Sequence, residues 1–251
     1  MEKSYYKEYS HFLDRDMEFN VYGTGGLAIL VFPAQNGRFF DYEGFKMTDV
    51  IADKIDSGVV QLFCCDSIDI ETWSDEYGDP RKRIELHEKW YNYICEELVS
   101  RIHEINPESA TRKILTTGCS MGGTHCLNFM LRRPDLFCGT IALSGYYDSE
   151  MFFKNYYDDL IYANTPTQYL SGMSPDHPYV DAYNKSAIYV CCGQGAWEDE
   201  MRECITKVEN QFKRLGVNAF IDRWGYDVNH DWPWWRIQLP YFLNKVLEGG
   251  F

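Results

Sequence analysis

The chain has 251 residues, of which 45% are hydrophobic and 16% aromatic, and its formal net charge is −14. The length fits a single domain over residues 1–251, and the hydrophobic content can fill a sizeable core. A surface this acidic repels nucleic-acid phosphates and anionic lipids, so the composition argues against nucleic acids and membranes as partners.

Predicted strands and helices alternate through most of the chain. In chain order they are strands Met17–Tyr22 and Leu27–Phe32, helix Thr48–Asp56, strand Val59–Cys65, helix Arg81–Ile105, strand Lys113–Thr117, helix Met121–Arg132, strands Gly139–Leu143 and Ala187–Cys192, helix Glu198–Leu215, strand Val217–Trp224 and helix Trp234–Leu247. This alternation predicts an α/β fold with a mostly parallel central sheet and helices on both faces. Ligands bind such sheets at the carboxyl ends of the strands, so reactive residues are expected there.

Three segments carry further signals. Thr48 is predicted to cap the helix that it begins, and Pro107 to end the long amphipathic helix before it. Residues 149–185 have mixed composition, and we expect either a cap over a site or an irregular insert. Residues 1–16 are polar and lack the apolar core of a secretory signal, and no run of about 18 apolar residues occurs.

The nine cysteines form no Cys-x-x-Cys pair. The adjacent pairs Cys64–Cys65 and Cys191–Cys192 lie in apolar runs and are typical of small hydrophobic residues in buried strands. This usage suits a reducing compartment and indicates no zinc ribbon. We therefore expect a cytoplasmic protein, and the sequence implies neither a metal nor an organic cofactor.

The sharpest motif is Gly118-Cys119-Ser120-Met121-Gly122-Gly123, a Gly-x-Ser-x-Gly pattern between a predicted strand and a predicted helix. A serine there must occupy a strained turn, and the small residues around it let the backbone pass closely. Its hydroxyl then lies exposed at a helix N-terminus, where the helix dipole favours a developing oxyanion. The alternative is a glycine-rich turn with an incidental serine. The context favours Ser120 as a nucleophile.

A nucleophilic serine needs a base, and His230 is the best placed of the six histidines. It falls in the loop between the last predicted strand and the last predicted helix. In the chain order serine, acid, histidine, this loop is where the base belongs. His87 and His103 are each followed by glutamate, but neither has a second histidine four residues on, so a zinc-protease motif is excluded.

The acid of a triad should follow the strand Ala187–Cys192, where three carboxylates occur: Glu198, Asp199 and Glu200. Spacing alone does not separate Glu198 from Asp199. The oxyanion hole needs two donors. One is the main-chain N–H of Met121, and the other should come from the loop after Phe32, with Gln35 favoured over Asn36.

These motifs resemble the putative-esterase family of α/β-hydrolases, which includes esterase D, feruloyl esterases and mycolyltransferases. The resemblance runs from about Phe32 to Leu239. Its most specific part is Asn229-His230-Asp231-Trp232-Pro233-Trp234-Trp235, similar to a His-x-Trp-x-x-Trp pattern with a catalytic histidine. The segment from Cys192 to Glu198 is similar to the mycolyltransferases, whose acid is a glutamate, and this favours Glu198. The family's frequent His-Gly at the first oxyanion loop is replaced by Pro33-Ala34-Gln35.

The resemblance implies an α/β-hydrolase fold and a serine esterase that cleaves a small-molecule, carbohydrate or thioester substrate through an acyl-enzyme. An acyltransferase with the same triad is one alternative. The other is a non-catalytic protein that binds carbohydrate or protein through exposed aromatic side chains. Trp73 and Tyr146 are the candidate substrate contacts, although each could equally be a core or rim aromatic.

Overall fold

The computed structural model describes residues 1–249. The elements are β1 (Lys3–Ser10), β2 (Arg15–Tyr22), β3 (Leu27–Phe32), α1 (Asp41–Gly44), η1 (Asp49–Ile51), α2 (Ala52–Asp56), β4 (Val60–Cys65), η2 (Asp69–Glu71), α3 (Pro80–Asn92), η3 (Tyr93–Leu98), α4 (Val99–Ile105), α5 (Ser109–Arg112), β5 (Ile114–Cys119), α6 (Met121–Arg132), β6 (Phe137–Leu143), α7 (Glu150–Phe153), α8 (Asp159–Ala163), α9 (Pro166–Gly172), α10 (Pro178–Asn184), β7 (Ala187–Cys192), α11 (Asp199–Leu215), β8 (Phe220–Arg223) and α12 (Trp232–Gly249).

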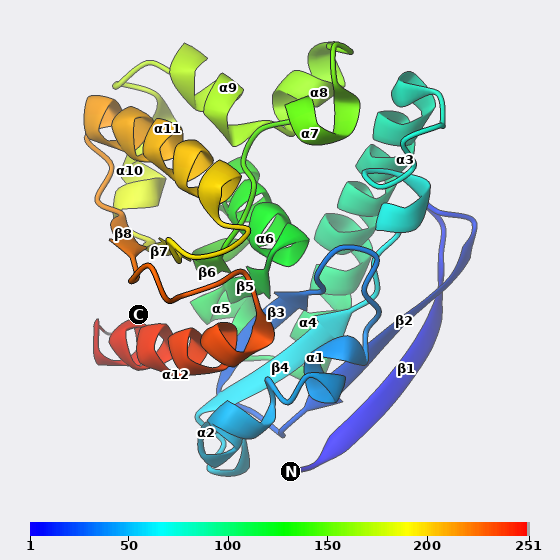
Figure 1. Ribbon diagram of the computed structural model, residues 1–251. Coiled ribbons are helices and arrows are strands. Elements are labelled where there is room, and N and C mark those ends of the chain that lie inside the picture. The colour runs from blue at the N-terminus through cyan, green and yellow to red at the C-terminus, as the bar shows by residue number, and fades with distance from the viewer. Residues whose placement is uncertain (250–251) are drawn as a thin grey trace.

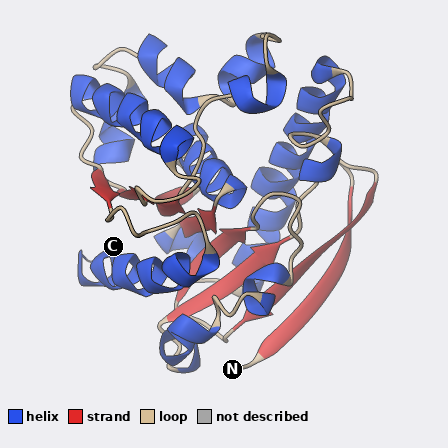
Figure 2. Ribbon diagram, in the orientation of Figure 1, coloured by secondary structure: helices blue, strands red, loops and turns tan. Residues whose placement is uncertain are grey.

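One sheet runs through the middle of the molecule (Figure 2). Within residues 1–249 it has eight strands in the order β1-β2-β4-β3-β5-β6-β7-β8. The strands from β4 to β8 are parallel, whereas β1 and β2 pair antiparallel at one edge. The predicted fold class, a mostly parallel sheet in an α/β protein, is therefore confirmed.

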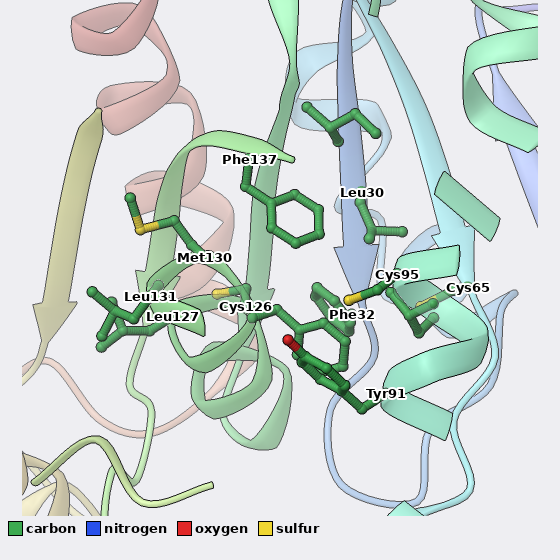
Figure 3. Close-up of a cluster of buried hydrophobic side chains, with 14 of the residues drawn as sticks. Leu30, Phe32, Cys65, Tyr91, Cys95, Cys126, Leu127, Met130, Leu131 and Phe137 are labelled. Atoms are coloured by element: carbon green, nitrogen blue, oxygen red, sulfur yellow. The ribbon is translucent and has the colours of Figure 1, made fainter. Parts of the chain in front are cut away.

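Helices cover both faces of the sheet (Figure 1). The short helices α1 and α2 pack with α12 on one face, and α3, α4, α6 and α11 pack on the other. Central strands such as β3, β4 and β5 are buried along their whole length, because helices lie on both sides of them. Figure 3 shows part of the larger core, where Phe32 and Phe137 meet Cys126 and Met130 from α6.

The N-terminal edge strand β1 was not predicted. Its residues alternate between exposed and half-buried positions, because an edge strand has solvent on one side and only β2 as a partner. The tyrosines Tyr5 and Tyr9 point outward, and only Tyr6 stacks inward on Phe19, with ring centroids 4.8 Å apart. A polar, alternating strand of this kind carries little hydrophobic signal.

Other predicted elements differ in detail, and the predicted strand Val217–Trp224 is shorter in the structure, where β8 begins at Phe220. The long helix from Arg81 to Ile105 exists, but a π-helical turn, η3, divides α3 from α4. The Thr48 side chain makes no capping bond, and a 3₁₀ turn precedes α2 there. Segment 149–185 is not irregular: it forms four short helices, α7 to α10.

Among the described residues no helix combines the length and the apolar character that crossing a bilayer requires.

Candidate active site

Ser120 lies on a strained turn between β5 and α6. Its backbone has φ 57° and ψ −123°, a combination that a non-glycine residue seldom adopts. The main-chain N–H of Ser120 donates to the carbonyl of Leu143 at 2.9 Å, which ties the turn to the end of the neighbouring strand β6. The turn therefore presents the hydroxyl at the carboxyl edge of the sheet, at the first turn of α6.

Glycines on both sides of Ser120 are required by close backbone packing. A Cβ on Gly118 would lie 2.4 Å from the carbonyl oxygen of Gly122. A Cβ on Gly122 would lie 2.3 Å from the carbonyl oxygen of Phe32 and 2.7 Å from that of Pro33. Gly122 thus lets the start of α6 pack directly on the loop that follows β3. Cys119 lies between Gly118 and Ser120, and burial raises the pKa of its thiol well above its usual range. The Cys119 thiol therefore stays protonated beside the serine.

The imidazole of His230 contacts the serine hydroxyl. Its Nε2 atom lies 2.9 Å from the Ser120 Oγ, although the two residues are 110 positions apart in the chain. The His230 side chain is largely buried, and its ring packs edge-on against Trp235, with centroids 5.0 Å apart. For the Ser120 hydroxyl to donate to Nε2, a neutral imidazole must carry its own proton on Nδ1.

The carboxylate of Glu198 faces that Nδ1 atom. Glu198 is 0% exposed, and its Oε1 atom lies 3.6 Å from His230 Nδ1, which is longer than a hydrogen bond. The same Oε1 accepts a hydrogen bond from the Ser144 hydroxyl at 2.6 Å. Asp199, the alternative acid, is exposed on the first turn of α11 and pairs with Arg202. The geometry favours Glu198 over Asp199 as the group that faces the imidazole.

The loops that carry Glu198 and His230 are joined along their length. The main-chain N–H of His230 donates to the Ala196 carbonyl at 3.0 Å, and that of Gly195 to the Val228 carbonyl at 2.9 Å. The Asn229 side chain accepts from the N–H of Ala196 at 2.8 Å. These bonds hold the loop that carries Glu198 against the loop that carries His230.

The two expected oxyanion donors border the serine. Gln35 and Met121 both line a cavity that also contains Ser120 and His230. Within residues 1–249, neither main-chain N–H of this pair donates to a protein acceptor. The side chain of Gln35 instead donates to the Ser74 hydroxyl at 2.8 Å, which fixes the loop after β3 to the loop after β4.

The cavity has a volume of about 240 Å³ and is largely apolar away from the serine. Its remaining lining comes from α6, the loop after β6, α7, the loop before α11 and the first turn of α11: Thr124, Tyr146, Met151, Phe152, Trp197, Glu200 and Met201. Burial raises the pKa of Tyr146 to about 12, so its phenol stays neutral at pH 7. Trp197 is 82% exposed and has a positive φ of 67°, which places its ring at the rim.

Trp73 does not line this cavity, which corrects its assignment as a substrate contact. It is 1% exposed, and its indole N–H donates to His87 Nδ1 at 3.0 Å. Its ring packs edge-on against Phe152, with centroids 5.6 Å apart. Trp73 is therefore a core residue that supports a cavity wall.

Several lining residues were not predicted, because Met151 and Phe152 lie in the short helix α7, and the Trp197 position depends on a left-handed turn. Ser144 was also missed, although it directly follows a strand whose carboxyl end was expected to carry reactive groups.

Among the described residues, no three histidine, cysteine or acidic side chains are arranged to hold a metal ion.

The model of the family described as Putative esterase matches residues 10–245. The chain belongs to this family. No curated protein matches this esterase-family chain.

Solved structures resemble this member of the esterase family over nearly its whole length. A ferulic acid esterase superposes with a TM-score of 0.72 at 16% identity, covering 97% of this chain and 98% of its own. FphF, a fluorophosphonate-binding serine hydrolase of Staphylococcus aureus, gives 0.72 at 14% identity, covering 97% of each chain. An S-formylglutathione hydrolase from Agrobacterium tumefaciens gives 0.70 at 14%, covering 96% and 94%. These likenesses establish the α/β-hydrolase fold of this esterase-family chain.

Proposed function

We propose that the protein is a serine carboxylesterase with Ser120 as nucleophile, His230 as base and Glu198 as the acid that faces the imidazole. The observation that carries this proposal is the 2.9 Å contact between His230 Nε2 and Ser120 Oγ at a strained strand-to-helix turn. Membership of an esterase family supports the same chemistry.

The reaction has two halves. Ser120 Oγ attacks the ester carbonyl carbon while its proton passes to His230 Nε2, and the carbonyl oxygen becomes an oxyanion facing the main-chain N–H groups of Met121 and Gln35. When the intermediate collapses, His230 returns the proton to the leaving alcohol and an acyl-serine remains. Water then attacks the acyl carbonyl while one of its protons passes to His230 Nε2. When this second intermediate collapses, His230 returns the proton to Ser120 Oγ, which leaves as the free hydroxyl, and the carboxylic acid is released.

The cavity supports an acyl group that is compact and largely apolar. Its volume of about 240 Å³ lies beside the serine, and Met151, Phe152 and Met201 form its apolar walls. We propose a small-molecule or carbohydrate ester as substrate. Acetyl and feruloyl esters and a glutathione thioester are the compounds to compare, the last two because similar folds include a ferulic acid esterase and an S-formylglutathione hydrolase.

The test measures hydrolysis of a short-chain p-nitrophenyl ester and labelling by a fluorophosphonate probe. Ser120→Ala is expected to lose both, with kcat falling by at least roughly 10³-fold and the melting temperature little changed. Ser57→Ala is the control, because Ser57 is exposed beyond α2 and its hydroxyl donates to the nearby Lys54 carbonyl, away from the proposed site. Undiminished hydrolysis by Ser120→Ala would refute the proposal. A product ester formed faster than free acid when an alcohol is added would identify an acyltransferase with the same triad.

A further inference from the structure

The buried carboxylate of Glu198 is held by a side chain outside the proposed triad. Glu198 is fully buried, and burying a carboxylate is costly unless hydrogen bonds compensate for lost water. Within residues 1–249, Ser144 is the one hydrogen-bond donor to this carboxylate, at 2.6 Å from Oε1, and Oε2 has no partner. The oxygen that Ser144 holds is the one that faces His230 Nδ1.

The direction of this hydrogen bond is fixed by a second contact. The indole Nε1 of Trp235 lies 3.0 Å from the Ser144 Oγ. An indole N–H can only donate, so the Ser144 oxygen accepts from Trp235. The single hydroxyl proton of Ser144 is then free to donate to Glu198. A relay therefore runs from Trp235 through Ser144 to Glu198, and every group in it is buried.

Trp235 also contacts the base directly. Its ring packs edge-on against His230, with centroids 5.0 Å apart and an interplanar angle of 86°. The same side chain thus packs against the imidazole and, through Ser144, orients the carboxylate behind it. Ser144 itself is fixed by its main-chain N–H, which donates to the Cys191 carbonyl at 2.7 Å, and by a left-handed backbone with φ 53°.

We propose that Ser144 and Trp235 are positioning residues that aim Oε1 of Glu198 at His230 Nδ1, an inference that rests on the proposed esterase function. The gap of 3.6 Å between these atoms closes when His230 becomes positively charged during the reaction. With Ser144 in place, the carboxylate is already turned toward the proton that it must stabilise. Without it, Glu198 can rotate and the imidazolium loses its partner.

The experiment is a double-mutant cycle in kcat for the p-nitrophenyl ester. Ser144→Ala is expected to lower kcat about 10- to 100-fold with KM changed less than about 3-fold, as for loss of a hydrogen bond to a charged group. Trp235→Phe, which keeps a ring and removes the N–H, should lower kcat by a smaller factor. In a Glu198→Gln background, Ser144→Ala should lower kcat by less than about 3-fold further, because the charge that it orients is gone.

Thr117→Val is the matched control. Thr117 is a buried residue on β5 whose hydroxyl donates to the Ile141 carbonyl at 2.8 Å, and within residues 1–249 its side chain makes no hydrogen bond to a proposed triad member. It should lose stability as Ser144→Ala does, but keep kcat. Equal effects of Ser144→Ala in the wild-type and Glu198→Gln backgrounds would overturn the inference, as would a kcat no lower than that of Thr117→Val. If Ser144→Ala does not fold, Trp235→Phe is measured in the same cycle with the same criteria. Wild-type kcat in Glu198→Gln would instead refute the assignment of the acid in the proposed function.

Discussion

Gly122→Ala is the substitution that tests most directly how the fold positions the reacting serine. The added Cβ would lie 2.3 Å from the carbonyl oxygen of Phe32 and 2.7 Å from that of Pro33. Both atoms belong to the backbone, so no side-chain rotation relieves the overlap. Carbon and oxygen atoms normally stay about 3.3 Å or more apart, so the loop after β3 must move by roughly 1 Å.

This movement separates the two proposed oxyanion donors. The loop carries Gln35, whereas Met121 stays with α6 and Ser120. Displacing a catalytic group by roughly 1 Å typically costs about 10²-fold in rate, and losing one oxyanion donor costs about 10²- to 10³-fold. We therefore expect kcat to fall at least roughly 10²-fold while KM changes little. Overpacking of this kind also lowers the free energy of unfolding by about 1–3 kcal/mol.

The assay combines steady-state hydrolysis of the p-nitrophenyl ester with urea denaturation. Gly44→Ala is the control, because a Cβ on Gly44, at the end of α1, would meet no atom within 4 Å. That variant should match the wild type in kcat and in stability. Wild-type kcat and stability in Gly122→Ala would show that the loop is not held against the helix as the structure has it.

Two further predictions concern groups around the site. Burial lowers the pKa of His87 well below 6.5. Below about pH 6.5, His87 therefore binds a proton in the unfolded chain but stays neutral in the folded chain. The free energy of unfolding then falls as the pH falls, by up to about 1.4 kcal/mol per pH unit. His87→Gln should remove that part of the slope in urea titrations at pH 5 and pH 7, and an unaltered slope would contradict this. Asn229→Ala removes the acceptor for the Ala196 N–H and should lower kcat roughly 5-fold, as for about 1 kcal/mol of hydrogen bonding. No change in kcat would show that the main-chain bonds between the two loops are sufficient.

The buried part of the fold was predictable because burial leaves a strong pattern. The predicted bounds of β3, α6 and β7 match the structure, since each element combines an apolar run or helical period with a clear turn signal at its ends. The helices in segment 149–185 were missed, although Pro166 and Pro178 each occupy the first position of a helix, where proline is favoured. Their short length gives no hydrophobic period that a sequence pattern can detect.

The proposed reacting groups were predictable for a different reason. In a parallel sheet the residues after each strand gather at one edge, so a motif after one strand predicts partners after the others. Ser120, Glu198 and His230 each follow a strand in this way, and the structure brings them together. The sequence pattern does not show which side chains near the ends of the strands face the cavity and which pack into the core. Trp73 follows β4, yet its side chain packs inward against Phe152 and His87.

The order of strands in space explains what a motif search leaves out. In the sheet, β6 lies between β5, which leads to Ser120, and β7, which leads to Glu198. The residue directly after β6 is therefore the one placed to reach both neighbours. Ser144 occupies that position, receives the N–H of Trp235 and donates to Glu198. A sequence motif identifies candidate nucleophiles, bases and acids. A residue that only orients those groups has no such motif, and it is found from the order of the strands in the sheet. Ser144 has no motif, and its proposed role follows from its place in the sheet.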